Sequence, residues 1–166
     1  MAKRLFIDLD LCNNCQECRA CCDYFYHPQN QGITSLREYA TFALFCRRCE
    51  EAPCVESCYH QALEKQADGI LKRYNMRCTS CKSCSVACPF GTILADFIPY
   101  LDSRCDYCLM AKDKLPKCLS SCPEKAIELI EIGADDLAND IYLIGEHLAV
   151  HTRRWSREVI QQVKKK

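Results

Sequence analysis

The pattern of apolar and polar positions predicts short strands near the N-terminus and in the middle of the chain. Every second residue over 5–11 is leucine or isoleucine, and this two-residue period indicates a half-buried strand that leads into the first cysteine. In the middle, the stretches 62–66 and 70–74 flank Asp68 and Gly69. That pair is the two-residue signal of a hairpin with a type I′ turn.

Elsewhere the pattern leaves more than one element possible. Residues 126–132, which follow Cys122 and Pro123, lie where a closing strand is expected, although Glu128 and Glu131 recur at a spacing of three and leave a helix possible. We favour the strand. Residues 35–45 and the segment after Pro89 fit either short helices or loops.

Composition directs attention to cysteine. It makes up 17 of the 166 residues, about a tenth of the chain and above ordinary usage. The 22 basic and 22 acidic side chains give a formal net charge of +0, which does not suit a nucleic-acid-binding protein. No apolar run approaches the roughly 18 residues of a membrane helix, and Asp8 comes before a secretory signal could form. We expect a soluble, cytoplasmic protein whose thiols bind metal rather than form disulfides.

Sixteen of the cysteines fall into four quartets, at positions 12, 15, 18 and 22; 46, 49, 54 and 58; 78, 81, 84 and 88; and 105, 108, 118 and 122. The first and third quartets have identical spacing, since each cysteine of the third lies 66 residues after its counterpart in the first. The second and fourth agree at both ends, and the fourth carries a five-residue insertion within 109–117. This regularity predicts an internal duplication.

Some candidate ligands are not predicted to bind metal. The offset of the repeat makes Cys22, and not its neighbour Cys21, the counterpart of Cys88, so Cys21 is not predicted as a ligand. The histidines share no metal-binding spacing with a quartet, and none is predicted as a ligand. They are His27, His60, His147 and His151.

The spacing within the quartets favours iron–sulfur clusters over zinc. Three thiolates in a Cys-x-x-Cys-x-x-Cys run can wrap one face of a cubane, and in two-cluster ferredoxins the fourth cysteine, often followed by proline, binds the other cluster. Pro89 and Pro123 each follow the last cysteine of a quartet. Zinc sites use two Cys-x-x-Cys pairs and have no need of a third cysteine at the same step. The sequence therefore predicts four [4Fe-4S] clusters, with four zinc ions as the competing interpretation.

The order of these quartets over residues 1 to about 133 resembles a known family. It is that of the four-cluster ferredoxin-like electron-transfer (beta) subunits of molybdenum and tungsten oxidoreductases, and of related hydrogenase, formate dehydrogenase, carbon monoxide dehydrogenase and aldehyde oxidoreductase complexes. The resemblance implies that the first and fourth quartets exchange their last ligands, as do the second and third. The implied ligand sets are Cys12, Cys15, Cys18 and Cys122; Cys105, Cys108, Cys118 and Cys22; Cys46, Cys49, Cys54 and Cys88; and Cys78, Cys81, Cys84 and Cys58. This chain departs from the simplest pattern in having Asp23 and Tyr59 where proline would follow the cysteine.

The resemblance also implies a fold of the α+β class, rich in loops, with two ferredoxin-like bis-[4Fe-4S] modules related by duplication. Residues 1–35 with 96–133 would form the outer module and 36–95 the inner one. Membrane-anchored members continue into a transmembrane helix, whereas 134–166 hold only short apolar stretches. This C-terminal extension is too short for a core of its own, so it packs back on the ferredoxin body or, as we favour, contacts another subunit.

Four-cysteine cubanes leave no iron open to substrate, and the chain has neither a Gly-x-x-x-x-Gly-Lys nor a Gly-x-Gly-x-x-Gly loop. We therefore expect a non-catalytic subunit. It would relay electrons between a catalytic subunit with pterin-bound tungsten or molybdenum, or a hydrogenase-like centre, and a flavin-containing NAD(P)H subunit or a ferredoxin. The alternative is a free soluble polyferredoxin. Co-export with a partner leaves the periplasm as a second location.

Charge near the clusters is the remaining feature of the sequence. Each bound cluster with its thiolates carries about −2, and four carry about −8, which predicts docking to basic partner surfaces. Arg47 and Arg48 lie inside the second quartet and Lys82 inside the third. These cations either favour the reduced clusters or are solvated surface charges, and the sequence leaves both possible.

Overall fold

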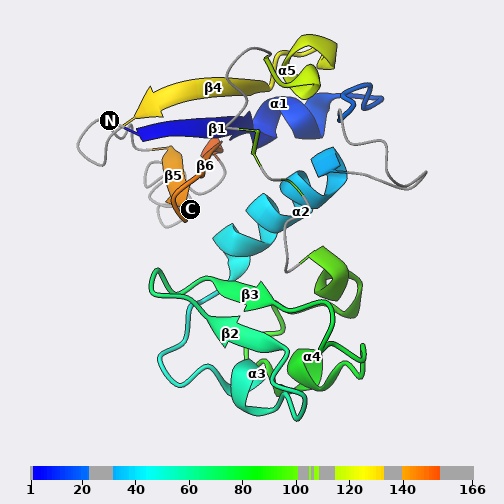
Figure 1. Ribbon diagram of the computed structural model, residues 1–166, viewed down its shortest axis with the longest axis vertical. Coiled ribbons are helices and arrows are strands. Elements are labelled where there is room, and N and C mark those ends of the chain that lie inside the picture. The colour runs from blue at the N-terminus through cyan, green and yellow to red at the C-terminus, as the bar shows by residue number, and fades with distance from the viewer. Residues whose placement is uncertain are drawn as a thin grey trace, which may run out of the picture. The chain divides into compact units, whose positions relative to one another are not determined.

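The computed structural model describes residues 2–22, 32–100, 105, 107–108, 115–132 and 140–153. The chain divides into two compact units, which are described separately below (Figure 1). The split unit comprises Met1–Ile33 with Cys105–Lys166, and the central unit comprises Thr34–Arg104. Helices and strands are mixed, as the α+β class predicts. Within the described residues, no helix combines the length and apolar character that crossing a membrane requires.

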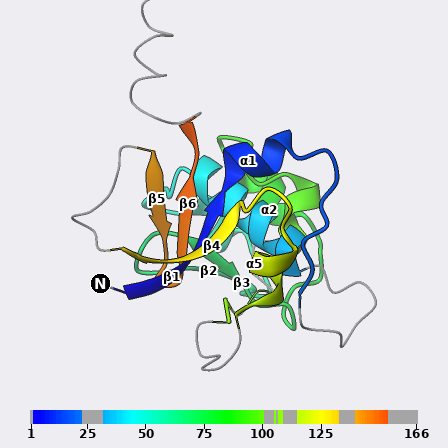
Figure 2. The same ribbon diagram turned by 90° about the horizontal axis from the view of Figure 1, so that it is seen from above.

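A four-stranded sheet forms the body of the split unit, with strand order β4-β1-β6-β5 (Figure 2). β1 pairs antiparallel with β4 and parallel with β6, and β5 pairs antiparallel with β6. The strands are β1 (Ala2–Asp8), β4 (Ile127–Ile132), β5 (Ile141–Ile144) and β6 (Leu148–His151), and the helices of this unit are α1 (Leu9–Asn14) and α5 (Lys117–Ser121).

The first predicted strand exists but ends earlier than its apolar pattern indicates. Leu5 and Ile7 are buried in β1 as expected. The strand stops at Asp8, whose side chain accepts a hydrogen bond from the Leu11 backbone N–H (2.9 Å) and caps α1. An N-terminal cap of this kind turns the chain into a helix. The alternation that continues to Leu11 was therefore misleading, and Leu9 is buried from a helix instead.

The closing strand is confirmed. Residues 127–132 form β4, which pairs with β1 from Ile127 opposite Ile7 to Ile132 opposite Ala2. The glutamates that left a helix possible are exposed on the strand. The place of this segment after the last quartet, rather than the spacing of its glutamates, was the correct guide here.

The C-terminal extension packs back on the body where it is described. β6 lies between β1 and β5, and Leu148, Ala149 and Val150 have exposed fractions of 0 %. We favoured contact with another subunit. Residues 141–151 instead pack on the body of the split unit, because their apolar side chains complete this sheet. Residues 154–166, with Trp155, lie outside the described part of the chain.

His151 attaches the end of β6 to the start of α1. Its Nδ1 lies 2.7 Å from Asp8 Oδ2, and its Nε2 lies 3.0 Å from Asp140 Oδ2. Burial alone would lower the pKa of His151, but the hydrogen bonds and charges of Asp140 and Asp8 outweigh it and raise that pKa. Both ring nitrogens therefore carry protons in the favoured state. Beside this group, Asp10 accepts hydrogen bonds from Thr152 Oγ1 (2.8 Å) and the Arg153 backbone N–H (2.9 Å).

We expect the stability of the split unit to fall with rising pH around the His151 pKa. Because this pKa is higher in the folded state, the contribution is complete below the unfolded value near 6.5 and is lost as pH rises through the folded value. H151Q should remove the contribution of this histidine to the pH dependence and cost about 2 kcal/mol at pH 6, typical of a hydrogen bond to a charged group. Denaturant unfolding of the holoprotein at pH 6 and pH 9 measures both effects. The exposed His147 provides the control H147Q. If the free energy of unfolding changed with pH equally in H151Q and in the wild type, the assignment to His151 would be wrong.

The central unit packs short helices against a two-stranded hairpin (Figure 1). Its apolar core consists of Phe42, Cys54, Leu63, Leu71, Ile93 and Ile98, and five more cysteines pack against that core. The candidate ligands of this unit are thus part of its interior. The elements are α2 (Gly32–Phe45, which begins in the split unit), α3 (Pro53–Glu56), β2 (Leu63–Lys65), β3 (Leu71–Arg73), α4 (Ser83–Ala87) and the 3-10 helix η1 (Ala95–Tyr100).

The predicted hairpin is confirmed, but its turn is of another type. β2 and β3 are antiparallel, and the Gln66 backbone N–H donates to the Ile70 carbonyl (2.8 Å), which leaves a three-residue loop. A type I′ turn requires positive φ at both central residues, whereas only Gly69 (φ 81°) has it here. The Asp68 side chain instead accepts a hydrogen bond from the Ile70 N–H (2.9 Å).

Candidate metal centres

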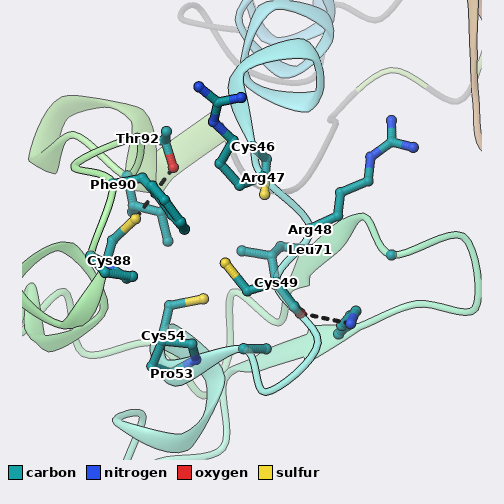
Figure 3. A pocket seen from close by; sticks show the side chains of 15 residues that line it. Cys46, Arg47, Arg48, Cys49, Pro53, Cys54, Leu71, Cys88, Phe90 and Thr92 are labelled. Atoms are coloured by element: carbon teal, nitrogen blue, oxygen red, sulfur yellow. Dashed lines mark hydrogen bonds between the residues drawn. The ribbon is translucent and has the colours of Figure 1, made fainter.

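Four cysteines line a cavity of the central unit, here called the first cavity. Their sulfur atoms point toward a common space between α2, α3 and the turn after α4 (Figure 3). They are Cys46, Cys49, Cys54 and Cys88. Three of them belong to the second quartet and the fourth closes the third quartet, so this cavity joins residues from both quartets.

The second cavity repeats this composition in reverse. It is lined by Cys58, Cys78, Cys81 and Cys84, three cysteines of the third quartet and the last of the second. Each cavity encloses about 370 Å³ of empty space, including the part open to solvent. Among the described residues, no group of three or more His, Cys, Asp or Glu side chains is arranged to hold a single metal ion. The ligand sets remain predictions, and this grouping of three plus one supports them.

A repeated turn aims a backbone N–H at the first sulfur of three quartets. Arg48, Ser80 and Tyr107 each precede the second cysteine and have positive φ (51°, 56° and 62°). Their backbone N–H groups hydrogen-bond the thiols of Cys46, Cys78 and Cys105 respectively, the last at 3.3 Å. A left-handed conformation costs a non-glycine residue about 1 kcal/mol or more, and such strain gathers at functional sites.

A second repeated turn follows the last cysteine of a quartet. Residues three positions further on have positive φ, and their N–H groups donate to the cysteine carbonyl; they are Gln61 (2.9 Å to Cys58), Gly91 (3.1 Å to Cys88) and Lys125 (3.3 Å to Cys122). The next residue reaches the sulfur, through the N–H of Ala62 (3.2 Å), the Oγ1 of Thr92 (3.3 Å) and the N–H of Ala126 (3.4 Å). At Cys58 the turn forms with Tyr59 in place of proline. The counterpart after Cys22 lies outside the described residues.

These turns supply the environment that an iron–sulfur cluster requires. Hydrogen bonds from N–H and O–H groups to sulfur stabilise thiolate charge and tune the cluster potential. Sequence reasoning did not find these donors, because only Gly91 carries the glycine signal of a left-handed residue. Short helices complete the arrangement, since the third cysteine is the second residue of α3, α4 and α5 in turn.

Buried thiols in the cavities need a cation to become thiolates. Burial, together with the neighbouring thiols of Cys46 and Cys88, raises the pKa of Cys54 to about 11. Burial likewise raises the pKa of Cys46 and of Cys84, although backbone N–H groups partly oppose it. Metal ligands must be deprotonated thiolates. These cavities therefore suit a positively charged iron–sulfur core bound by four sulfurs.

The thiols nearer the surface have the opposite tendency. The pKa of Cys81 is lowered by hydrogen bonds from the Ser83 side chain and backbone. Burial would raise the pKa of Cys88, but hydrogen bonds led by the Thr92 side chain lower it overall. Each cavity thus contains at least one thiol that ionises more easily than usual, and a lowered thiol pKa favours metal binding.

In the split unit, the ends of the first and fourth quartets lie together. The Cys21 backbone N–H donates to Ser121 Oγ (3.0 Å), so their chain neighbours Cys22 and Cys122 are brought close. Cys118 is buried in α5, and Cys12 lies on α1. Cys15 caps α1, while Cys18 is exposed. Cys105 and Cys108 are half-buried. The grouping of these eight cysteines into two clusters remains a prediction.

The cations that the sequence analysis placed inside the second and third quartets line the cavities of the central unit. Arg47 and Arg48 line the first, and the Arg47 guanidinium lies 5.9 Å from the Phe90 ring centre. Lys82 and His60 line the second. His60 is exposed and packs edge-on against Tyr59. Sequence reasoning missed Lys65, which donates to the Cys49 carbonyl (2.7 Å).

Comparison with known proteins identifies similar sequences. Residues 37–132 match the family model described as the 4Fe-4S dicluster domain. An uncharacterized ferredoxin, MJ0155, of Methanocaldococcus jannaschii is 31% identical over 77% of this chain and 80% of its own length. Formate hydrogenlyase subunit 2 of Escherichia coli K12 is 27% identical over 79% of this chain and 83% of its own length. The putative oxidoreductase AegA of the same strain is 30% identical over 72% of this chain, which spans only 20% of AegA.

Proposed function

Because this chain belongs to the 4Fe-4S dicluster domain family, we propose that it is an electron-transfer subunit with four [4Fe-4S] clusters, which relays electrons between a catalytic subunit and a second redox partner. The match to the 4Fe-4S dicluster domain and the names of two relatives, a ferredoxin and a ferredoxin-like protein, support an iron–sulfur electron carrier. The observation that carries the proposal is the pair of cavities in the central unit. Each is lined by four cysteines, three from one quartet and one from the other.

In this proposal the chain binds and shields the clusters and performs no catalysis itself. A [4Fe-4S] cluster, when bound, takes up and releases single electrons. The four thiolates of each cavity would hold the irons of one cluster, and the buried core keeps water from one side of each site. The N–H groups in the two repeated turns stabilise negative charge on the sulfur atoms, and no proton is transferred. Residues of this kind would tune the potential of a cluster and fix its position, as an electron relay requires.

The split unit would hold the other two clusters. The proposed sets are Cys12, Cys15, Cys18 and Cys122, and Cys105, Cys108, Cys118 and Cys22. The contact between Cys21 and Ser121 supports this exchange, because it joins the chain beside the two cysteines that would change places. The left-handed Tyr107 and Lys125 also repeat the turns of the central unit, which supports the proposed duplication.

The proposed partners are redox proteins. One is a catalytic subunit with pterin-bound tungsten or molybdenum, or a hydrogenase-like centre, and the other is a flavin-containing NAD(P)H subunit or a ferredoxin. Two names support a catalytic partner: a relative of nearly equal span is a formate hydrogenlyase subunit, and a putative oxidoreductase contains the matching segment as a fifth of its length. The second candidate, a free polyferredoxin, is favoured by MJ0155, a ferredoxin of similar span.

Anaerobic purification from the native cells tests this function. We expect about 16 iron and about 16 acid-labile sulfide per chain, as four cubanes require, and recovery together with a larger redox subunit. A colourless, zinc-loaded protein would overturn the iron–sulfur assignment. A brown monomer with about 16 iron and no stable partner would instead identify the polyferredoxin.

A further inference from the structure

Arg73 places a buried cation at the second cavity of the central unit. It is the last residue of β3 and has an exposed fraction of only 8 %. It lines the cavity together with Cys58, Cys78 and Leu63, and Leu63 lies opposite it in the hairpin register. A guanidinium is always charged in proteins. A fixed positive charge therefore lies beside the sulfurs that would hold this cluster.

The guanidinium contacts a ligand sulfur directly. It donates a hydrogen bond to the Cys78 thiol. Burial would raise the pKa of Cys78, but the Ser80 backbone N–H and the Arg73 side chain lower it overall. The side chain thus stabilises negative charge on that sulfur, through both a hydrogen bond and its own charge.

The first cavity receives a different side chain from the same strand. Leu71 lies two residues before Arg73, on the same face of β3, and lines the first cavity. That cavity has cations of its own, but Arg47 and Arg48 are exposed, where solvent screens their charge. The Lys65 ammonium donates hydrogen bonds to the carbonyl oxygens of Cys49 and Glu50 (2.7 and 3.2 Å). Its charge is therefore partly offset by those carbonyl dipoles instead of acting on a sulfur atom. Arg73 differs in being buried and bonded to sulfur.

We propose that Arg73 raises the reduction potential of the cluster held by Cys58, Cys78, Cys81 and Cys84. This inference rests on the proposed function. When one electron arrives from a neighbouring cluster, the core changes from 2+ to 1+ and the site gains one negative charge, with no proton or bond exchanged. Arg73 stabilises that added charge because the surrounding core is a poor dielectric. Lys72, which lies between Leu71 and Arg73, is exposed and has no such effect.

Potentiometric titration of the holoprotein with dithionite, followed by electron paramagnetic resonance, tests this role. In R73M, one of the clusters should become harder to reduce, so that its reduced-to-oxidised ratio at fixed potential falls about tenfold, equivalent to about 59 mV for one electron. R73K keeps the charge and should restore most of the wild-type ratio. K72M removes the same charge from the exposed face and is the matched control. A shift in R73M no larger than that in K72M would overturn the proposal.

Two further outcomes separate this inference from the proposed function. If the wild-type protein holds no iron, the proposed function fails first. If R73M does not load clusters, R73Q and R73K form a pair of similar polarity that differs in charge, and their potentials decide the question. Equal potentials in that pair would mean that Arg73 only helps to assemble the cavity.

Discussion

Replacing Cys88 with alanine should remove the cluster of the first cavity, although Cys88 closes the third quartet in the sequence. The variant should keep about 12 of about 16 irons, because one cubane loses its fourth ligand and dissociates. Iron and sulfide assays on anaerobically purified protein measure the loss. C21A is the matched control: Cys21 is half-buried like Cys88 but belongs to no predicted ligand set, and its variant should retain about 16 irons.

Double variants show which cluster Cys88 serves. C54A and C88A remove two ligands of one cavity, so the double variant should lose no more iron than either single variant. C84A and C88A affect different cavities, so their losses should add and leave about 8 irons. The reverse result, additive for Cys54 and not for Cys84, would contradict the exchange of ligands between the second and third quartets.

Truncating the chain after Gly133 should unfold the split unit and spare the central unit. The deletion removes β6, which pairs with β1, and with it the fully buried Leu148 and Val150. Burying each such side chain contributes about 1.5–3 kcal/mol, a large part of the roughly 5–15 kcal/mol that stabilises a domain. We expect about half of the iron to be lost, which leaves the roughly 8 irons of the central unit. Far-UV circular dichroism should report the missing sheet.

The control for this deletion is a chain that ends at Arg153. It keeps β5, β6 and the contacts of His151 with Asp8 and Asp140, and it should retain about 16 irons. Full cluster content after the longer deletion would mean that β5 and β6 are dispensable. From the sequence alone we had favoured a role of residues 134–166 in subunit contact.

Local patterns predicted several elements correctly. The alternation in β1 and the apolar stretches of the hairpin each reflect which side chains one strand buries, and that is visible within a few residues of sequence. The predicted strand end and turn type were wrong where a side chain accepted a hydrogen bond from a backbone N–H group. Asp8 ended β1 by capping α1, and Asp68 bonded the Ile70 N–H in a loop that a dipeptide signal had assigned to another turn.

The left-handed residues beside the cysteines were invisible in the sequence for a different reason. Arg48, Ser80 and Gln61 have side chains that normally avoid positive φ, so no propensity marks them. The need to direct an N–H at sulfur imposes this conformation. Their positions could have been inferred only from their fixed offset to the nearest cysteine, once one quartet had been seen in three dimensions.

By itself the sequence determined how the thiols are grouped along the chain and that metal is their natural use, because ligand spacing is a property of short, contiguous segments. Only the tertiary structure decided which sulfurs of the central unit line one cavity, that β6 inserts beside β1, and that Arg73 meets Cys78. Each of these depends on pairing between distant segments. The energy of such pairing comes from burying surfaces together, and no single segment carries that information.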